Sequence, residues 1–225
     1  MDRELFRQQA ASIGLELSSA QLDSFEQFEE ALYEANKVMN LTRVPREEAW
    51  SRHFIDSLLF HDLIPKGATV LDIGSGPGFP AWPLAAARPD ILVTALDANG
   101  KTTAFLQSQA LPNLQVVQDR AEDFPQRERY EIVTGRALAP LAMQLELSAA
   151  ACKVGGLVLP LRSKSDLELA QSFDASRLGL ALEKAEVRLL PGTDIERLFP
   201  VYRKLKPTPA KYPRRWSEIK NTPLT

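Results

Sequence analysis

The chain contains few of the side chains that bind metals or form disulfides. Its 225 residues include one cysteine and two histidines. A single cysteine excludes an internal disulfide and a cysteine-based metal cluster, and His53 and His61 are too few and badly spaced for a zinc site. We therefore expect no metal, and we expect a reducing, cytoplasmic setting.

Long apolar runs are also missing. No segment approaches the roughly 20 apolar residues that cross a membrane, and residues 1–4 do not begin a signal peptide. The chain is 44% hydrophobic and 25% charged, which is typical of a soluble globular protein. These features predict no membrane partner, and a length that suits one large domain or a domain with a small appendage.

The net charge of −2 conceals an uneven distribution along the chain. Residues 1–66 carry seven Lys/Arg against twelve Asp/Glu, whereas residues 202–220 carry seven Lys/Arg against one acid, Glu218. Such an asymmetry indicates a polyanionic partner that is contacted by the C-terminal end.

A glycine-rich stretch is the most informative segment. Residues 69–73 are apolar and partly β-branched, and Gly74, Gly76 and Gly78 then alternate with small or rigid residues before a predicted helix. Glycine reaches the backbone angles of a sharp turn at low cost, and its missing Cβ leaves room for a ligand. The order of strand, glycine loop and helix is that of the first unit of a nucleotide-binding parallel sheet.

Spacing around this loop discriminates between nucleotides. Phe79 stands where the dinucleotide motif G-x-G-x-x-G needs its third glycine, and no Lys-Ser/Thr follows as in a P-loop. Asp72 precedes the loop, and Asp97 ends the next apolar run, where a carboxylate can accept hydrogen bonds from a ribose diol. The pattern resembles the S-adenosylmethionine (SAM) loop of class I methyltransferases. A tight turn beside an unrelated surface aspartate is the alternative interpretation.

The chain divides into three parts by pattern. Residues 1–64 are predicted to form three helices, residues 65–206 an α/β domain with a mostly parallel sheet, and residues 207–225 a basic tail. Within the tail, residues 211–216 are too proline-rich for a helix. The strands are expected at residues 69–73, 91–97, 114–117, 132–134, 157–161, 182–190 and 199–205. The helices after the first two are expected at about residues 47–61, 100–110, 140–151 and 163–178, with a turn at Gly155-Gly156.

Polar residues follow several predicted strands and should meet at one edge of the sheet. They lie at Asp97–Asn99, Asp119–Asp123 and Gly135–Ala137. Taken alone, Glu122 would serve equally well at a helix start, and Arg136 in a surface ion pair. Their shared position at the carboxyl edge favours a functional cleft.

Six motifs resemble, in order, those of one family. They are Asn40–Thr42, His53–Leu58, Asp72–Pro80, Arg120–Asp123, Arg136–Ala137 and Lys211–Arg215. Together they resemble the small-subunit ribosomal RNA guanine-N7 methyltransferases, the RsmG family formerly called glucose-inhibited division protein B. The resemblance covers nearly the whole chain. It implies a Rossmann-like class I SAM-dependent methyltransferase fold, with helices on both faces of the sheet and a helical N-terminal extension.

The resemblance also implies residue roles. It places SAM contacts at Gly74, Phe79, Asp97, Ala98, Asn99, Ala121, Glu122 and Arg136. The residues expected to bind RNA are Arg162, Lys211, Arg214 and Arg215, and Arg136 is expected near the target base. The implied partner is 16S rRNA or the small ribosomal subunit, and we expect a monomer. Arg162-Ser163 replaces the family's usual Lys-Gly, and Trp216–Ile219 stands where glycine and proline are usual.

Methylation at guanine N7 would need no acid–base residue. N7 is an unprotonated in-plane lone pair at neutral pH, so the enzyme must only align it with the methyl and the sulfur and exclude water. Accordingly, no catalytic residue is expected beyond those that position the substrates. Residues 135–138 lack the Asn/Asp-Pro-Pro-Tyr/Phe loop of amine methylation. Cys152 is interpreted as a core residue rather than as a nucleophile.

Two questions stay open at the level of the sequence. His53 and Asp56, at helical spacing, are interpreted as a packing contact between the helices and the sheet rather than as a catalytic pair. The alternative function is a SAM- or nucleotide-binding regulatory protein that has the fold without transferase activity.

Overall fold

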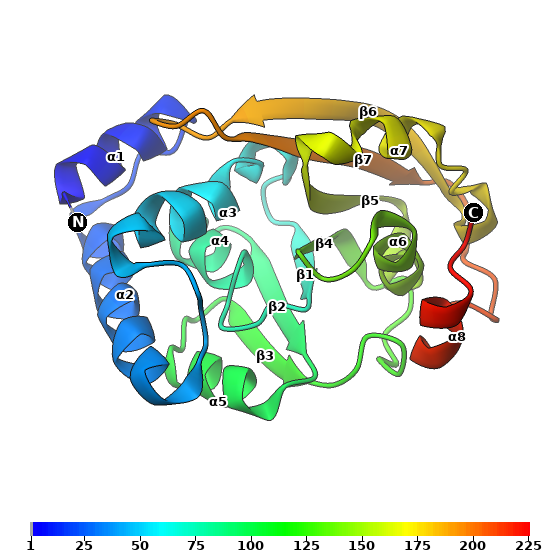
Figure 1. Ribbon diagram of the computed structural model, residues 1–225, viewed down its shortest axis with the longest axis horizontal. Helices are drawn as coiled ribbons and strands as arrows, with labels where there is room; N and C mark the ends of the chain where they lie inside the picture. Colours follow the sequence, from blue (N-terminus) through cyan, green and yellow to red (C-terminus); the bar gives the residue numbers. More distant parts are fainter. Residues whose placement is uncertain (1) are drawn as a thin grey trace.

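The computed structural model describes residues 2–225 and contains one seven-stranded sheet (Figure 1). The strand order is β3-β2-β1-β4-β5-β7-β6. Strands β1 to β5 are parallel, and β7 runs antiparallel to both its neighbours, β5 and β6. The strands are β1 (Thr69–Ile73), β2 (Leu92–Asp97), β3 (Leu114–Gln118), β4 (Tyr130–Arg136), β5 (Cys152–Ser163), β6 (Leu180–Leu189) and β7 (Glu196–Lys204).

Helices precede the sheet and connect its strands. The chain begins with α1 (Arg3–Ser12) and α2 (Ser19–Met39), and α2 starts at a capping box between Ser18 and Gln21. The remaining α-helices are α3 (Asp56–Leu58), α4 (Ala81–Ala87), α5 (Gly100–Ser108), α6 (Leu141–Ala149), α7 (Leu167–Ser172) and α8 (Trp216–Asn221). None of the helices in the described part of the chain is long and apolar enough to span a membrane.

Four predicted segments differ from the structure. The helix expected at residues 47–61 is irregular, with a 3-10 turn, a π-helical turn at Trp50–Ile55 and α3. The helix expected at residues 163–178 is reduced to α7 between two 3-10 turns. The turn expected at Gly155-Gly156 is a bulge inside the longer strand β5, where the register with β4 shifts and Gly155 has φ +86°. The tail carries a helix, α8, which begins after the prolines.

The reversal of strand order lies between β1 and β4. In a sheet of this kind, ligands bind over the carboxyl ends of the strands at that point. Here β1 ends at Ile73, β2 at Asp97 and β4 at Arg136, so the polar residues predicted to share an edge do follow neighbouring strands.

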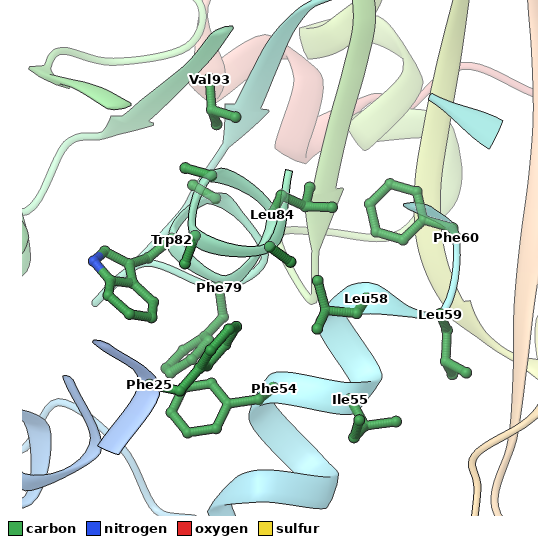
Figure 2. Close-up of a cluster of buried hydrophobic side chains, with 14 of the residues drawn as sticks. Phe25, Phe54, Ile55, Leu58, Leu59, Phe60, Phe79, Trp82, Leu84 and Val93 are labelled. Atoms are coloured by element: carbon green, nitrogen blue, oxygen red, sulfur yellow. The ribbon is translucent and has the colours of Figure 1, made fainter. Parts of the chain in front are cut away.

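The two faces of the sheet carry separate cores. Alternate strand residues point to opposite faces, and Val70 packs with the α1–α5 side while Leu71 packs with α6 and α7. On the first side, aromatic rings from the N-terminal helices meet rings from the glycine loop and α4. Figure 2 shows Phe54 close to Phe79, and the centroids of these two rings are 5.9 Å apart. The helical part and the sheet thus share one hydrophobic core, and the domain boundary at residue 64 stays a prediction.

Phe54 lies at the centre of this aromatic cluster and offers a test of it. Its ring packs against Phe25 and Trp50, with centroids 5.2 and 5.3 Å apart, and its side chain is fully buried. Phe54→Ala should lower the free energy of unfolding by about 3–5 kcal/mol, because it removes buried apolar surface and leaves a cavity. Val38→Ala, on the exposed side of α2, is the control and should change stability by less than about 0.5 kcal/mol. Equal chemical denaturation midpoints for the two variants would contradict this description of the core.

Candidate active site

A first cavity lies over the ends of β1, β2 and β3. Its volume is about 190 Å³, and we call it the Asp97 cavity. Five of the residues predicted to contact SAM line it, whereas Phe79, Asn99 and Arg136 do not. The lining residues are Ile73, Gly74, Leu96, Asp97, Ala98, Asp119, Arg120, Ala121, Glu122, Leu138, Leu147 and Trp216.

Asp97 organises the loops around this cavity. Its Oδ2 accepts a hydrogen bond from the backbone N–H of Gly76 at 2.8 Å, and its Oδ1 accepts one from that of Asn99 at 2.8 Å. Asn99 in turn caps α5 by accepting from the N–H of Lys101. Gly76 has φ +54°, a conformation that glycine adopts without strain. The carboxylate therefore holds the glycine loop and the start of α5 on either side of the cavity.

Asp72 is a buried carboxyl group with an unused oxygen. Its Oδ2 accepts from the N–H of Ala81 at the start of α4 at 3.0 Å, whereas its Oδ1 has no hydrogen-bond partner in the described structure. The pKa of Asp72 is raised to about 7, chiefly by burial and to a smaller extent by the nearby charge of Asp97. The N–H of Ala81 and the charge of Arg136 act in the opposite direction. A cationic ligand group near this edge would favour the charged form of Asp72.

A second cavity of about 440 Å³ lies between the irregular helix and the ends of β4 and β5. We call it the Arg136 cavity. Its wall contains four arginines and two aspartates, namely Arg52, Arg136, Arg162, Arg197, Asp56 and Asp166. It is therefore rich in groups that bind phosphate and base edges.

Arg136 stands at the centre of a hydrogen-bonded network. Its Nη1 donates to Asp56 Oδ2 at 3.1 Å and to the carbonyl of Arg52 at 3.0 Å, and its guanidinium lies 5.2 Å from the centroid of the Phe79 ring. Asp56 also accepts from Arg197 Nε at 2.6 Å. Burial lowers the pKa of Arg136, while the charge of Asp56 raises it. The buried carboxylate of Asp56 thus accepts hydrogen bonds from two arginines, one at the end of β4 and one in β7.

His53 completes this network from the helical side. Burial, together with the charges of Arg136 and Arg52, lowers the pKa of His53 to about 3, so the ring is neutral at neutral pH. Arg136 Nη2 lies 3.2 Å from His53 Nδ1. Because arginine can only donate, Nδ1 accepts, and Nε2–H donates to Thr42 Oγ1 at 2.7 Å. His53 and Asp56 thus connect the helical part to the sheet through Arg136, as interpreted from the sequence, and their lack of a catalytic role stays a prediction.

The loop between β4 and α6 separates the two cavities. Arg136 and Ala137 line the Arg136 cavity, and Leu138 lines the Asp97 cavity. Ala137 has φ +53°, which is uncommon for a residue with a side chain. The Cβ that an alanine would place at Gly74 lies 2.6 Å from the Leu138 side chain, so the glycine loop and this loop approach closely.

Comparison with known proteins identifies the family. A family model described as rRNA small subunit methyltransferase G matches residues 21–194. Ribosomal RNA small subunit methyltransferase G of Limosilactobacillus reuteri is 39% identical over an alignment that covers 96% of each chain. The protein of that name from Exiguobacterium sp. is 38% identical over the full length of both chains. The chain belongs to this family.

Solved structures confirm the fold. TYW2 of M. jannaschii, in complex with AdoMet (SAM), is similar with a TM-score of 0.56 at 17% identity, over 69% of this chain and 78% of that chain. A TehB-like SAM-dependent methyltransferase from Corynebacterium glutamicum gives a TM-score of 0.55 at 19% identity, over 78% and 98%. The class I methyltransferase fold predicted from the sequence is therefore confirmed.

As a member of this methyltransferase family, the protein uses SAM as its cofactor. The residues fit that cofactor. SAM carries an ammonium and a sulfonium, and the unpartnered Oδ1 of Asp72 is an acceptor suited to a cation. Carboxylates also line the Asp97 cavity, and so does Gly74 of the glycine loop.

Two of the arginines predicted to bind RNA have partners inside the protein. Arg214 donates from Nε and Nη2 to the two carboxylate oxygens of Glu146, at 2.8 and 2.7 Å, and the Glu146 side chain is fully buried. Arg162 donates to Asp166 and to the carbonyl of Ala139, both at 2.7 Å. Arg214 is therefore held by a buried carboxylate, and its assignment to RNA binding, like that of Arg162, stays a prediction. Lys211 and Arg215 are not buried, and their assignment stays a prediction.

Several residues of the two cavities carried no recognised motif. Arg197 lies near the start of β7, and its partner Asp56 lies 141 residues earlier in the chain. Leu138 and Trp216 line the Asp97 cavity, and only the departure of Trp216 from the family pattern distinguished it in the sequence. Residues that pair across such distances in the sequence produce no local sequence pattern from which the pair could be predicted.

The raised pKa of Asp72 predicts a pH effect on stability. In the unfolded chain this carboxyl ionises near its ordinary pKa of 3.8, whereas in the fold it stays protonated until about pH 7. The resulting stabilisation is complete below pH 3.8 and is lost as the pH rises through 7. Asp72→Asn cannot ionise but can still accept from Ala81, so its stability relative to wild type should rise by on the order of 2 kcal/mol between about pH 5 and pH 8.

Chemical denaturation of both proteins across this pH range measures the difference. Saturating SAM should reduce it at the higher pH, because a cation compensates the carboxylate only in the wild-type protein. Parallel stability curves would show that Asp72 does not titrate in this range.

Proposed function

We propose that the protein transfers the methyl group of SAM to N7 of a guanine in 16S rRNA. The observation that carries this proposal is a pair of cavities on either side of the loop at residues 136–138, in a chain that belongs to an rRNA methyltransferase family. In the proposal the cofactor binds in the Asp97 cavity, and the target guanine enters the Arg136 cavity. The proposed site of action is the cytoplasm, and the proposed active form is the monomer.

Named residues would hold the cofactor. Asp97 would accept hydrogen bonds from the ribose hydroxyls, and Ala98, Ala121 and Glu122 would surround the adenine. Asp72 would face the positive end of the methionine part, because its Oδ1 has no other partner in the described structure. The cofactor, when bound, supplies an electrophilic methyl group on a sulfonium.

The chain's own residues then need to position and desolvate the nucleophile. Guanine N7 has a lone pair in the plane of the ring and no proton to lose, so alignment and exclusion of water are the main requirements. His53 is neutral and already accepts from Arg136, and in the proposal it positions that arginine rather than removing a proton. Arg136, with its rigid fork of donors, is placed to orient the base.

The wall of the Arg136 cavity contains carboxylates as well as arginines, and this mixture of charges favours a cationic product, N7-methylguanine. Methylation at N7 moves the positive charge from sulfur to the guanine ring. A wall of arginines alone would oppose that movement, whereas the carboxylates of Asp56 and Asp166 in the same wall favour it.

The direct test is methyl transfer to RNA that lacks the modification. The protein, labelled SAM and unmethylated 16S rRNA or small subunits are incubated, and the labelled base is identified as N7-methylguanine. We expect incorporation at one guanine. Normal SAM binding with no incorporation into either RNA substrate would contradict the proposal and would favour a regulatory protein.

Arg136→Ala should lower the rate of methyl transfer at saturating RNA and SAM by on the order of 100-fold, because a misplaced base loses alignment with the methyl. Arg136→Lys keeps the charge and the pairing with Asp56 but loses the planar fork, and it should be partly impaired. Melting temperatures and SAM affinities of both variants distinguish loss of alignment from loss of structure. An unchanged kcat in folded Arg136→Ala would remove Arg136 from the site.

The exposed cations of the tail are proposed to hold rRNA phosphates. Replacing Lys211 and Arg215 by alanine should weaken RNA binding and reduce the slope of log K against log salt by about 1.4–1.8, because the RNA then has two fewer phosphates neutralised by the protein. SAM affinity should not change. The matched control replaces Arg7 and Lys37, exposed cations of α1 and α2, and should leave the slope unchanged. Equal slopes for the two double variants would show that RNA binds elsewhere.

A further inference from the structure

The Asp97 cavity is completed by a residue from the far end of the chain. Its wall is built mainly from the loops that follow β1 to β4, but Trp216 also lines it. Trp216 is the first residue of α8, which lies near α6 (Figure 1). It is also the one aromatic side chain among the residues that line this cavity in the described structure.

We propose that the C-terminal segment, Lys211–Asn221, is part of the cofactor site, with the indole of Trp216 packed against the adenine of SAM. This inference rests on the assignment of the Asp97 cavity to the cofactor under Proposed function. It gives the basic tail a second role besides RNA binding.

The chemistry of the cavity wall suits a purine. Asp97, Asp119 and Glu122 supply hydrogen-bond acceptors on one part of the wall, and Leu138 and Leu147 supply apolar surface on another. A purine presents polar edges and two apolar faces, and aromatic side chains bind such faces by stacking. Trp216 is half-buried, so its ring contacts the protein and still borders the cavity.

Buried contacts hold the segment in this position. The fully buried carboxylate of Glu146 on α6 accepts three hydrogen bonds from Arg214, from its backbone N–H, Nε and Nη2. Arg214 Nη1 donates to the carbonyl of Thr222, just beyond α8, at 3.0 Å. Arg214 thus connects the two ends of α8. Its removal would leave the carboxylate of Glu146 buried without a partner.

A second anchor comes from the loop that follows the cavity-lining residues 119–122. Arg127 donates to the carbonyls of Tyr212 and Thr208, at 2.8 and 2.9 Å. The side chains of Tyr212 and Ile219 are buried. The segment is therefore packed onto the domain from both α6 and this loop, which determines where Trp216 lies.

The structural alternative is that the segment only covers the hydrophobic core. In that case changes at Trp216 would lower the melting temperature and leave ligand affinity unchanged. The two interpretations are separated by measuring stability and binding on the same variants.

The test uses calorimetric titration of the full chain with S-adenosylhomocysteine and with 5′-methylthioadenosine, which keeps the adenosine and lacks the amino acid. Trp216→Ala should weaken both ligands by the same factor, roughly tenfold, because the indole stacks on the adenine that both ligands share. Trp216→Phe retains an aromatic face and should lose less than about threefold. Lys220→Ala, an exposed position of the same helix, is the control and should bind normally.

Fluorescence gives a readout that does not depend on stability. The chain has three tryptophans, and Trp50 and Trp82 are buried in the aromatic cluster between the N-terminal helices and α4. Binding of S-adenosylhomocysteine should change the emission of the wild-type protein, and this change should disappear in Trp216→Phe although that variant still binds. A change of the same size in Trp216→Phe would overturn the inference.

Asp97→Ala separates failure of this inference from failure of the cavity assignment. If Asp97→Ala weakens both ligands and folded Trp216→Ala does not, the cavity holds the cofactor without help from the tail, and the inference is wrong. If neither variant affects binding, the assignment of the cavity itself fails. Arg214→Ala, which frees the segment, should weaken the ligands in the same direction as Trp216→Ala.

Discussion

The site depends on the ion pairs that the buried carboxylate of Asp56 forms with two arginines. Asp56 lies on the short helix α3 and accepts from Arg136 at the end of β4 and from Arg197 in β7. Three parts of the chain that are distant in sequence are joined through one side chain. Asp56 also makes it possible to bury Arg136 beside Phe79, because an unpaired guanidinium would be costly there. The loop that divides the two cavities follows directly from Arg136.

Charge is separated across that dividing loop. Carboxylates dominate the polar wall of the Asp97 cavity, and arginines outnumber carboxylates in the wall of the Arg136 cavity. SAM is a cation in its reactive part, and RNA is a polyanion. Each proposed ligand therefore meets a wall of opposite charge, and the reacting atoms would meet at the boundary.

The sequence predicts those features whose causes are local. The glycine loop, the acid at the end of β2 and the alternation of strands and helices follow from backbone requirements and apolar periodicity, and they identify the sheet and the cofactor edge. The segment Trp50–Ile55 departs from its prediction in having a π-helical turn, and its apolar side chains are buried in a core built from distant parts of the chain, which periodicity does not describe. The bulge in β5 arises from the register with β4, which is a property of the pair. The positions of Arg214 and Trp216 likewise depend on Glu146, which lies between two leucines of α6 and 68 residues before Arg214. The sequence did not predict this ion pair, and it is the pair that places the tail beside the Asp97 cavity.

A crystal structure with S-adenosylhomocysteine and a guanine-containing fragment of the target RNA tests the central claim most directly. The account predicts the adenosine in the Asp97 cavity, its ribose at Asp97, and the sulfur directed past the loop at residues 136–138 toward guanine N7 in the Arg136 cavity. Adenosine bound in the Arg136 cavity, or a guanine held with N7 facing away from the sulfur, would contradict it.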